Sequence, residues 1–398
     1  MHRVGSIVLL FISATCRIWA ADDALPTDVH PESRSRLPLA KREDLDEQAR
    51  KGYDDTLAGI PGARPGMGAV IRLNGYRGNI VQADSPLGAA MMQLAILTTA
   101  REHDQPYEWS LHEMQAIAVG LDPAVIDLVR NRKPLGKIGG NEAAVIQISR
   151  ELSSTHRLSS ATYARAVKTL GQSNLIDVVG LMSDYTRTSA TLSAFNQQLP
   201  PGWRQGLPLP FTLPSDIHPD SRSRLPLVQG PAPPVAAGSF QSALYGRELA
   251  PKGTGPATIR RHGAGLRSLE ASVGKQTIDL AILVAAREHD AQYDWTMNEL
   301  ASIQDGLNPA VVEIIRGRKP VADLPAKDAC VIEFGRELFQ KHYVNPETYA
   351  RAVKIFGEKD LTDLVDVMAI HAKEAMLLAV FDQHLPAGQK PLLPLSSH

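Results

Sequence analysis

Cysteine is almost absent from this chain, with two residues, Cys16 and Cys330, among 398. Cys16 lies in an apolar N-terminal stretch with the pattern of an export signal, so cleavage leaves Cys330 alone. A lone cysteine forms no disulfide within the chain and supports no two-cysteine redox cycle. The sequence therefore excludes a disulfide-stapled fold and a self-contained dithiol enzyme.

Aromatic residues are also scarce, at 5% of the chain, and the formal net charge is −1. A nucleic-acid surface uses stacking aromatics and an excess of basic residues, so we predict no nucleic-acid partner. The chain has no serine- or cysteine-nucleophile motif and no phosphate loop. It also lacks a paired-histidine helix motif, and we predict no metal and no cofactor.

The N-terminal apolar stretch is short. Arg3 precedes apolar residues 4–14, and Ala20 and Ala21 offer a small-residue cleavage site. A membrane span needs about 20 apolar residues, more than this stretch provides. We predict a signal peptide at 1–20, an exported (periplasmic or extracellular) protein and no stable membrane span after cleavage. An uncleaved anchor and a lipid on Cys16 are the alternatives.

The chain does contain a long internal repeat, whose two copies keep one constant offset in the numbering. Residues 94–113 return as 280–299, and a leader at 28–39 returns as 216–227. This offset is far longer than a solenoid unit, so we predict two tandem domains, at 28–200 and 216–386, joined by a linker at 201–215. Two prolines in each leader favour an extended arm along the surface, with a substrate-binding arm as the alternative.

Both copies have the apolar spacing of helices, and strand alternation persists nowhere. Residues 92–103 form an apolar run long enough for a buried helix. Asp122 and Asn308 each precede a proline and predict helix starts. Long helical patterns cover about 175–198 and 361–383, whereas 59–68 and 229–265 are rich in Gly and Pro and predict loops. The predicted fold is all-α.

The best candidate for chemistry is the pair Glu108 and His112. The two residues are four apart and share one face of a helix. A carboxylate beside an imidazole forms a general acid/base, and the buried helix before it supplies an apolar wall. A surface ion pair is the alternative. Together with His103, Glu108 and His112 are also the residues of the sequence that could most readily form a metal site.

The second copy differs at both positions, with Asp294 and Asn298 in place of Glu108 and His112. Asn298 cannot exchange a proton as an imidazole does, so we expect the second site to be catalytically weak or silent.

Other candidates surround this pair in the repeat. Arg101 binds an anionic substrate or, alternatively, anchors a carboxylate of the protein. His103 lines a pocket or contacts the carbonyls at the end of its helix. Tyr107 and Trp109 are candidates for substrate contact, with core packing as the alternative. The equivalents in the second copy are Arg287, His289, Tyr293 and Trp295.

These residues resemble a known family. The run from Glu108 to His112, after Arg101 to Asp104 and before Gly120 and Leu121, is similar to the carboxymuconolactone decarboxylase family. The leader residues 35–39 and the segment 196–200 resemble a subgroup of it, so the resemblance covers both copies. It implies the all-α fold shared with alkyl hydroperoxidase D, in two tandem domains that pack as a pseudo-dimer within the chain, with association of several chains as a further expectation.

The resemblance also implies a choice between two reactions. The peroxidase branch uses two cysteines three apart, where this chain has Gln105 and Glu108, so thiol-peroxidase activity is disfavoured. The decarboxylase branch has a glutamate and a histidine at the positions of Glu108 and His112. The implied reaction is loss of a carboxylate from a small lactone or carboxylic acid. In it His112 donates or accepts the proton, and Glu108 orients the His112 imidazole.

Three hypotheses for function follow. The first is a carboxymuconolactone decarboxylase-like enzyme with its site in the first copy and a small-molecule substrate. The second is a non-catalytic binding or scaffold protein of the same fold. The third is a peroxide-related enzyme that uses the isolated Cys330.

Overall fold

The computed structural model describes residues 25–38, 41–44, 86–210, 214–228 and 255–395, together with residues 47, 50 and 54. These residues are helical and contain no strand, apart from two isolated bridges in the leaders, so the all-α prediction is confirmed. The helices, besides a 3₁₀ turn at Arg42–Asp44, are α3 (Gly88–Glu102), α4 (Pro106–Ala118), α5 (Pro123–Arg130), α6 (Gly140–Thr155), α7 (Ser160–Leu170), α8 (Gln172–Ala194), α10 (Pro256–Arg260), α11 (Leu266–Val273), α12 (Lys275–Glu288), α13 (Gln292–Gln304), α14 (Pro309–Arg316), α15 (Ala326–Lys341) and α16 (Pro346–Val380).

Helix α10 corrects the loop predicted at 229–265, because its Pro256 at the first helical positions starts a short helix there. The predicted signal peptide and the loop at 59–68 lie outside the described residues. Within the described residues, none of the helices combines the length and the apolar character that crossing a membrane requires.

Local sequence explains the helix starts. The side chains of Asp122 and Asn308 accept hydrogen bonds from the backbone N–H groups of Ala124 and Ala310, with distances of 2.8 and 2.9 Å. A cap of this kind typically contributes about 1 kcal/mol. Both starts were predicted from the residue before proline.

The long helix α16 corresponds to two helices of the first copy. Gly357 has φ 71° and interrupts its helical geometry. Gly171, the equivalent residue of the first copy, has φ 80° and separates α7 from α8. Glycine adopts this left-handed conformation at little cost, so both copies turn at the same place.

Each copy packs around one almost completely buried helix. In α3, residues 91–101 are all buried, and α12 has the same place in the second copy. Full burial of one Leu or Ile side chain is worth about 1.5–3 kcal/mol, so this apolar run is a large part of the stability of each copy.

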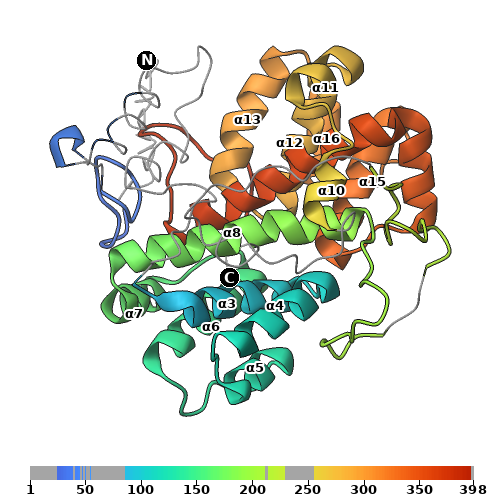
Figure 1. Ribbon diagram of the computed structural model, residues 1–398. Helices are drawn as coiled ribbons and strands as arrows, with labels where there is room; N and C mark the ends of the chain where they lie inside the picture. Colours follow the sequence, from blue (N-terminus) through green and yellow to red (C-terminus); the bar gives the residue numbers. More distant parts are fainter. Residues whose placement is uncertain are drawn as a thin grey trace, which may run out of the picture.

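The two copies exchange the ends of their last helices. Helices α8 and α16 lie side by side between the copies (Figure 1). The end of α8, with Leu192, packs with the core of the second copy together with Phe195, and the end of α16, with Val380, packs with that of the first together with Phe381. Each core is therefore completed by residues of the other copy.

The leaders reinforce this exchange. Arg36 donates from its backbone to the carbonyl of Phe381 at 2.7 Å, and Arg224 donates likewise to Phe195 at 2.9 Å. The guanidinium of Arg36 also donates to the carbonyls of Leu158 (2.8 Å) and Val380 (2.9 Å). Each leader thus ties its own copy to the end of the other copy's last helix.

The segment predicted as a linker also packs on the first copy. Leu207 is buried in the first core, and the backbone N–H of Gly206 donates to Ser110 Oγ at 3.2 Å. This stretch therefore follows the surface of the first copy as a fixed strap.

Candidate functional site

Helix α4 positions both members of the predicted acid/base pair. The side chain of Gln105 caps the helix by accepting from the N–H of Tyr107 at 3.0 Å, and Pro106 follows as the first helical residue. Glu108 lies in the first turn, where the helix dipole favours a negative charge. His112 follows one turn later on the same face.

The pair is formed and buried. Glu108 Oε2 lies 3.2 Å from His112 Nε2, and the two side chains are 3% and 0% exposed. The alternative of a surface ion pair is therefore wrong. Of the two side chains, only Glu108 retains any exposure.

His112 is held on both ring nitrogens. Its Nδ1 lies 2.9 Å from Gln93 Oε1, and the amide of Gln93 donates in turn to Gln115 at 3.0 Å. The ring of Tyr185 packs against the imidazole edge-on, with centroids 4.9 Å apart. The amide of Gln93 donates to Gln115, so its oxygen accepts from Nδ1, and Nε2 is the ring nitrogen that faces the Glu108 carboxyl group.

A cation from the second copy acts on Glu108. Arg260, at the end of α10, interacts electrostatically with the carboxylates of Glu108, Asp184 and Asp366. In the part of the chain that is described, its guanidinium makes no ion pair. The side chain is exposed, yet desolvation, followed by repulsion from Arg187, lowers its pKa. The guanidinium is thus accessible to solvent and lies close to charges of both signs.

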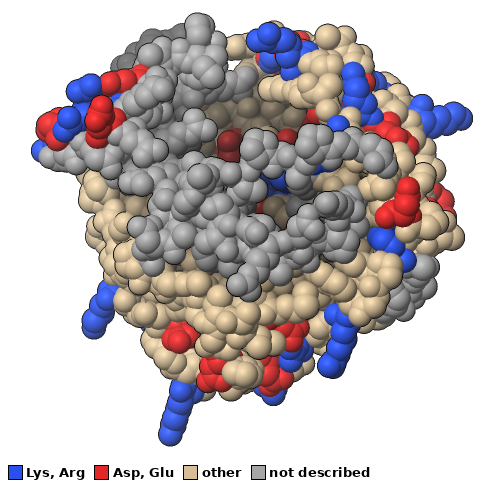
Figure 2. All heavy atoms as spheres, in the orientation of Figure 1, with Lys and Arg blue, Asp and Glu red and all other residues tan. Residues whose placement is uncertain are grey.

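Figure 2 shows a hollow in the face seen in Figure 1, with acidic and basic atoms inside it. Ion pairs between the copies join α8 and α16. Arg187 Nη2 donates to both carboxylate oxygens of Asp366, at 2.6 and 2.8 Å, and Lys373 pairs with Asp184. Burial raises the pKa of Asp184, and Lys373 opposes this shift. Arg260 is therefore the described cation that remains available for an anionic ligand here.

The second copy forms a different constellation at the equivalent place. Asp294 Oδ2 lies 2.8 Å from Nδ1 of His371 on α16, and Asn298 donates to Asp294 Oδ1 at 2.6 Å. Glu374 Oε2 is 3.8 Å from the same imidazole nitrogen. Asp294, His371 and Glu374 form the group of described residues with the spacing for a metal ion. The set of His103, Glu108 and His112, weighed from the sequence, is not brought together.

The repeated run from Arg101 to Asp104 shapes a turn. Arg101 donates to the carbonyl of Arg130 at 2.7 Å and pairs with Asp104, and Arg287 does the same with Arg316 (2.8 Å) and Asp290. Both aspartates have positive φ, 46° and 50°. These contacts of both arginines are structural, which agrees with the alternative that each anchors a carboxylate of the protein.

The aromatic candidates pack in the interior. Trp109 and Trp295 are fully buried, and each indole donates to a glutamate one turn later, at 2.7 Å to Glu113 and 2.6 Å to Glu299. Tyr107 is buried against the second copy's core, and Tyr293 is partly buried against the first.

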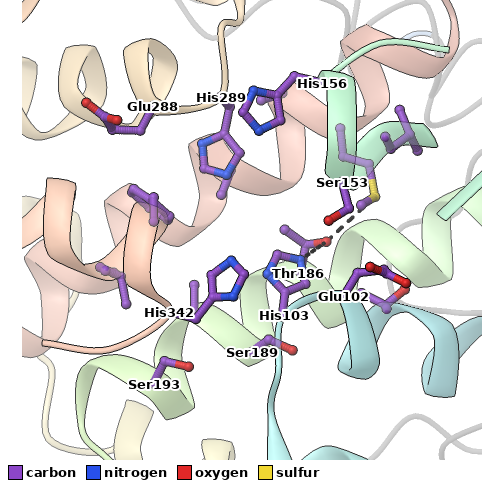
Figure 3. Close-up of a pocket in the computed structure, with 18 of the residues that line it drawn as sticks. Glu102, His103, Ser153, His156, Thr186, Ser189, Ser193, Glu288, His289 and His342 are labelled. Carbon is purple, nitrogen blue, oxygen red and sulfur yellow. Dashed lines mark hydrogen bonds between the residues drawn. The ribbon is translucent and has the colours of Figure 1, made fainter. Parts of the chain in front are cut away.

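His103 and His289 line a cavity between the copies, about 80 Å³ in volume, together with His156 and His342 (Figure 3). The histidines are paired across the copies: the ring centroids of His103 and His342 are 5.2 Å apart, and those of His156 and His289 are 5.9 Å apart. The repeat relates His156 to His342 as it relates His103 to His289. The sequence reasoning overlooked this second pair, although the repeat marks it.

Burial in the cavity favours the neutral forms of His103 and His289. Desolvation, followed by repulsion from His342, lowers the pKa of His103 well below its usual range. Desolvation, followed by repulsion from His156, lowers the pKa of His289 to about 4. His156 and His342 end α6 and α15 with φ of 53° and 52°, a conformation that suits glycine better. Both imidazoles line the cavity.

Cys330 has the properties of a core residue. It is a free thiol, 1% exposed, and burial raises its pKa. A reactive thiol needs exposure and a lowered pKa, so these properties disfavour the peroxide hypothesis.

We expect Cys330 to resist a thiol reagent in the native protein and to react at least about a hundredfold faster in the unfolded protein. In a Cys16→Ser variant Cys330 is the remaining cysteine, and its reaction with a chromogenic disulfide reagent, followed by absorbance, measures this ratio. Equal rates in buffer and in urea would revive the reactive-thiol hypothesis.

Comparisons of the chain with protein-family models, with curated proteins and with solved structures found no match. The assignment to a family and to a reaction therefore remains part of the proposal that follows.

Proposed function

We propose that the protein is an acid/base enzyme that acts on a small anionic substrate, as a carboxymuconolactone decarboxylase-like lyase, at Glu108 in the first copy. The supporting observation is a buried carboxyl–imidazole pair beside a cation that has no ion-pair partner among the described residues. Proton transfer by a positioned side chain typically contributes about 10²–10⁴-fold to a rate.

The roles of the pair differ from those expected from the sequence. Glu108 is the group that a substrate reaches, so it exchanges the proton, and His112 shares that proton and positions the carboxyl group. Arg260 replaces Arg101 as the residue proposed to bind the substrate's anionic group, because Arg101 is engaged in the α3–α4 turn.

The reaction balances with these groups. 4-Carboxymuconolactone has two carboxyl groups, of which one is lost and the other remains for Arg260. The carbon–carbon bond to the departing group breaks, carbon dioxide leaves, and the electron pair stays on the conjugated lactone. The proton held between Glu108 and His112 then goes to carbon, and solvent returns a proton to the pair.

The test is ultraviolet-monitored turnover of 4-carboxymuconolactone by the mature protein. We expect Glu108→Gln and His112→Ala each to lower kcat at least about a hundredfold. Arg260→Ala should mainly raise KM, because it removes binding of a group that does not react. Arg267→Ala, on the exposed surface of α11, is the matched control and should change neither constant.

An inactive wild-type protein would remove this substrate and this reaction. It would favour the alternative of a binding or scaffold protein, for which the structural use of Arg101 and Asp104 is the supporting observation.

A further inference from the structure

The second copy contains a carboxyl–imidazole pair, Asp294 and His371, that alignment of the two copies does not predict. His112 is replaced by Asn298, which removes the imidazole from α13. His371 on α16 occupies the position that Tyr185 has on α8, by the same alignment of the two copies. In the first copy Tyr185 touches His112 edge-on, so the two positions are neighbours across helices.

We infer that Asp294 and His371 form a second proton-transfer site for the same class of small anionic substrate, so that one chain has two sites. The inference rests on the proposed function. The imidazole of the second copy comes from His371 on α16 and not from position 298 on α13, and its Nδ1 lies 2.8 Å from Asp294 Oδ2.

Both sites consist of a carboxyl group, an imidazole and a side-chain amide. In the first copy the amide of Gln93 holds the imidazole. In the second copy Asn298 Nδ2 donates to Asp294 Oδ1 at 2.6 Å and to its backbone carbonyl at 2.8 Å, which holds the carboxylate. With Oδ1 occupied, Oδ2 faces His371.

The exposures assign the roles in this second site. His371 is 15% exposed and Asp294 is 8% exposed, the reverse of the order in the first copy. Asp294 holds Nδ1, so the proton is exchanged at Nε2, as in other aspartate–histidine pairs. His371 is therefore the catalytic acid/base, and Asp294 and Asn298 are positioning residues. As in the first site, carbon dioxide leaves, Nε2 gives its proton to the carbon that keeps the electron pair, and solvent returns a proton to Nε2.

The experiment compares wild type, Glu108→Gln, His371→Gln and the double variant in the turnover assay. We expect Glu108→Gln to retain at least about ten times the rate of the double variant. If His371→Gln adds nothing to Glu108→Gln, the second site is overturned while the first stands. An inert wild type removes both, so the two failures are distinguishable.

A swap of two residues provides the control for folding. In the Glu108→Gln background, His371→Tyr should abolish the residual rate. Adding Asn298→His then rebuilds the arrangement of the first copy, which this fold accommodates, and should restore turnover. Restoration supports the inference, and no restoration with a native circular dichroism spectrum contradicts it.

A metal ion at Asp294, His371 and Glu374 would take the imidazole and the carboxylate of the proposed site as ligands. Turnover by Glu108→Gln that is unchanged in EDTA supports proton transfer. Loss of that turnover in EDTA and its return with zinc would overturn it.

Discussion

Replacing Arg36 with alanine should lower the free energy of unfolding by about 3–5 kcal/mol. The guanidinium is buried and donates to Asp28 (2.8 Å) and to the carbonyls of Leu158 and Val380. It also stacks over the ring of Tyr163, 4.9 Å from the centroid. Truncation leaves a partly buried carboxylate and two carbonyls without this donor, and it removes the side-chain bond between the leader and the carbonyl of Val380.

Urea unfolding followed by circular dichroism measures the effect. Arg42→Ala is the matched control, since Arg42 forms a similar ion pair with Asp54 but the side chains are 53% and 49% exposed. Exposed pairs contribute about 0–1 kcal/mol. A loss for Arg36→Ala no larger than that for Arg42→Ala would show that the leader does not hold the two copies together.

Arg224→Ala should have a smaller effect than Arg36→Ala. Arg224 is the equivalent residue and pairs with Asp216 at 2.7 Å, but its Nη2 has no hydrogen-bond partner among the described residues and its contact with the carbonyl of Ala194 is long, at 3.3 Å. Removing the Arg224 side chain therefore leaves fewer hydrogen-bond acceptors without a donor than removing that of Arg36.

Acidification from pH 7 to about pH 4.5 should lower the stability by about 2–3 kcal/mol through His289 alone. Burial lowers the pKa of His289 from 6.5 to about 4. Between pH 6.5 and about 4, His289 is therefore protonated in the unfolded chain and neutral in the folded chain. Stability is complete above about pH 6.5 and is lost as the pH falls toward 4. His103, whose pKa is lowered by the same causes, adds to the loss.

The double variant His103→Gln with His289→Gln should flatten this dependence. Measurement of unfolding free energies at pH 7 and 4.5 for both proteins isolates the histidines, because the carboxylates with lowered pKa, such as Asp290 and Asp382, are charged in both states over most of this window. An equal loss in wild type and variant would mean that the cavity does not exclude protons.

Local rules were sufficient for part of the protein. Helix caps, apolar spacing and the four-residue separation of Glu108 and His112 involve neighbours within one or two turns, so the sequence alone predicts them. The repeat also shows which positions are equivalent, and the predicted starts of α5 and α14 agree with the structure.

Only the tertiary structure decided the remainder. The approach of His371 to Asp294, the electrostatic contact of Arg260 with Glu108 and the pairing of His103 with His342 join residues from different helices. Such contacts depend on how helices cross and exchange between the copies, and helical periodicity says which face is apolar without naming the partner of that face. The sequence therefore determined the helices and one carboxyl–imidazole pair, while packing decided which atoms are exposed and how the second pair is assembled.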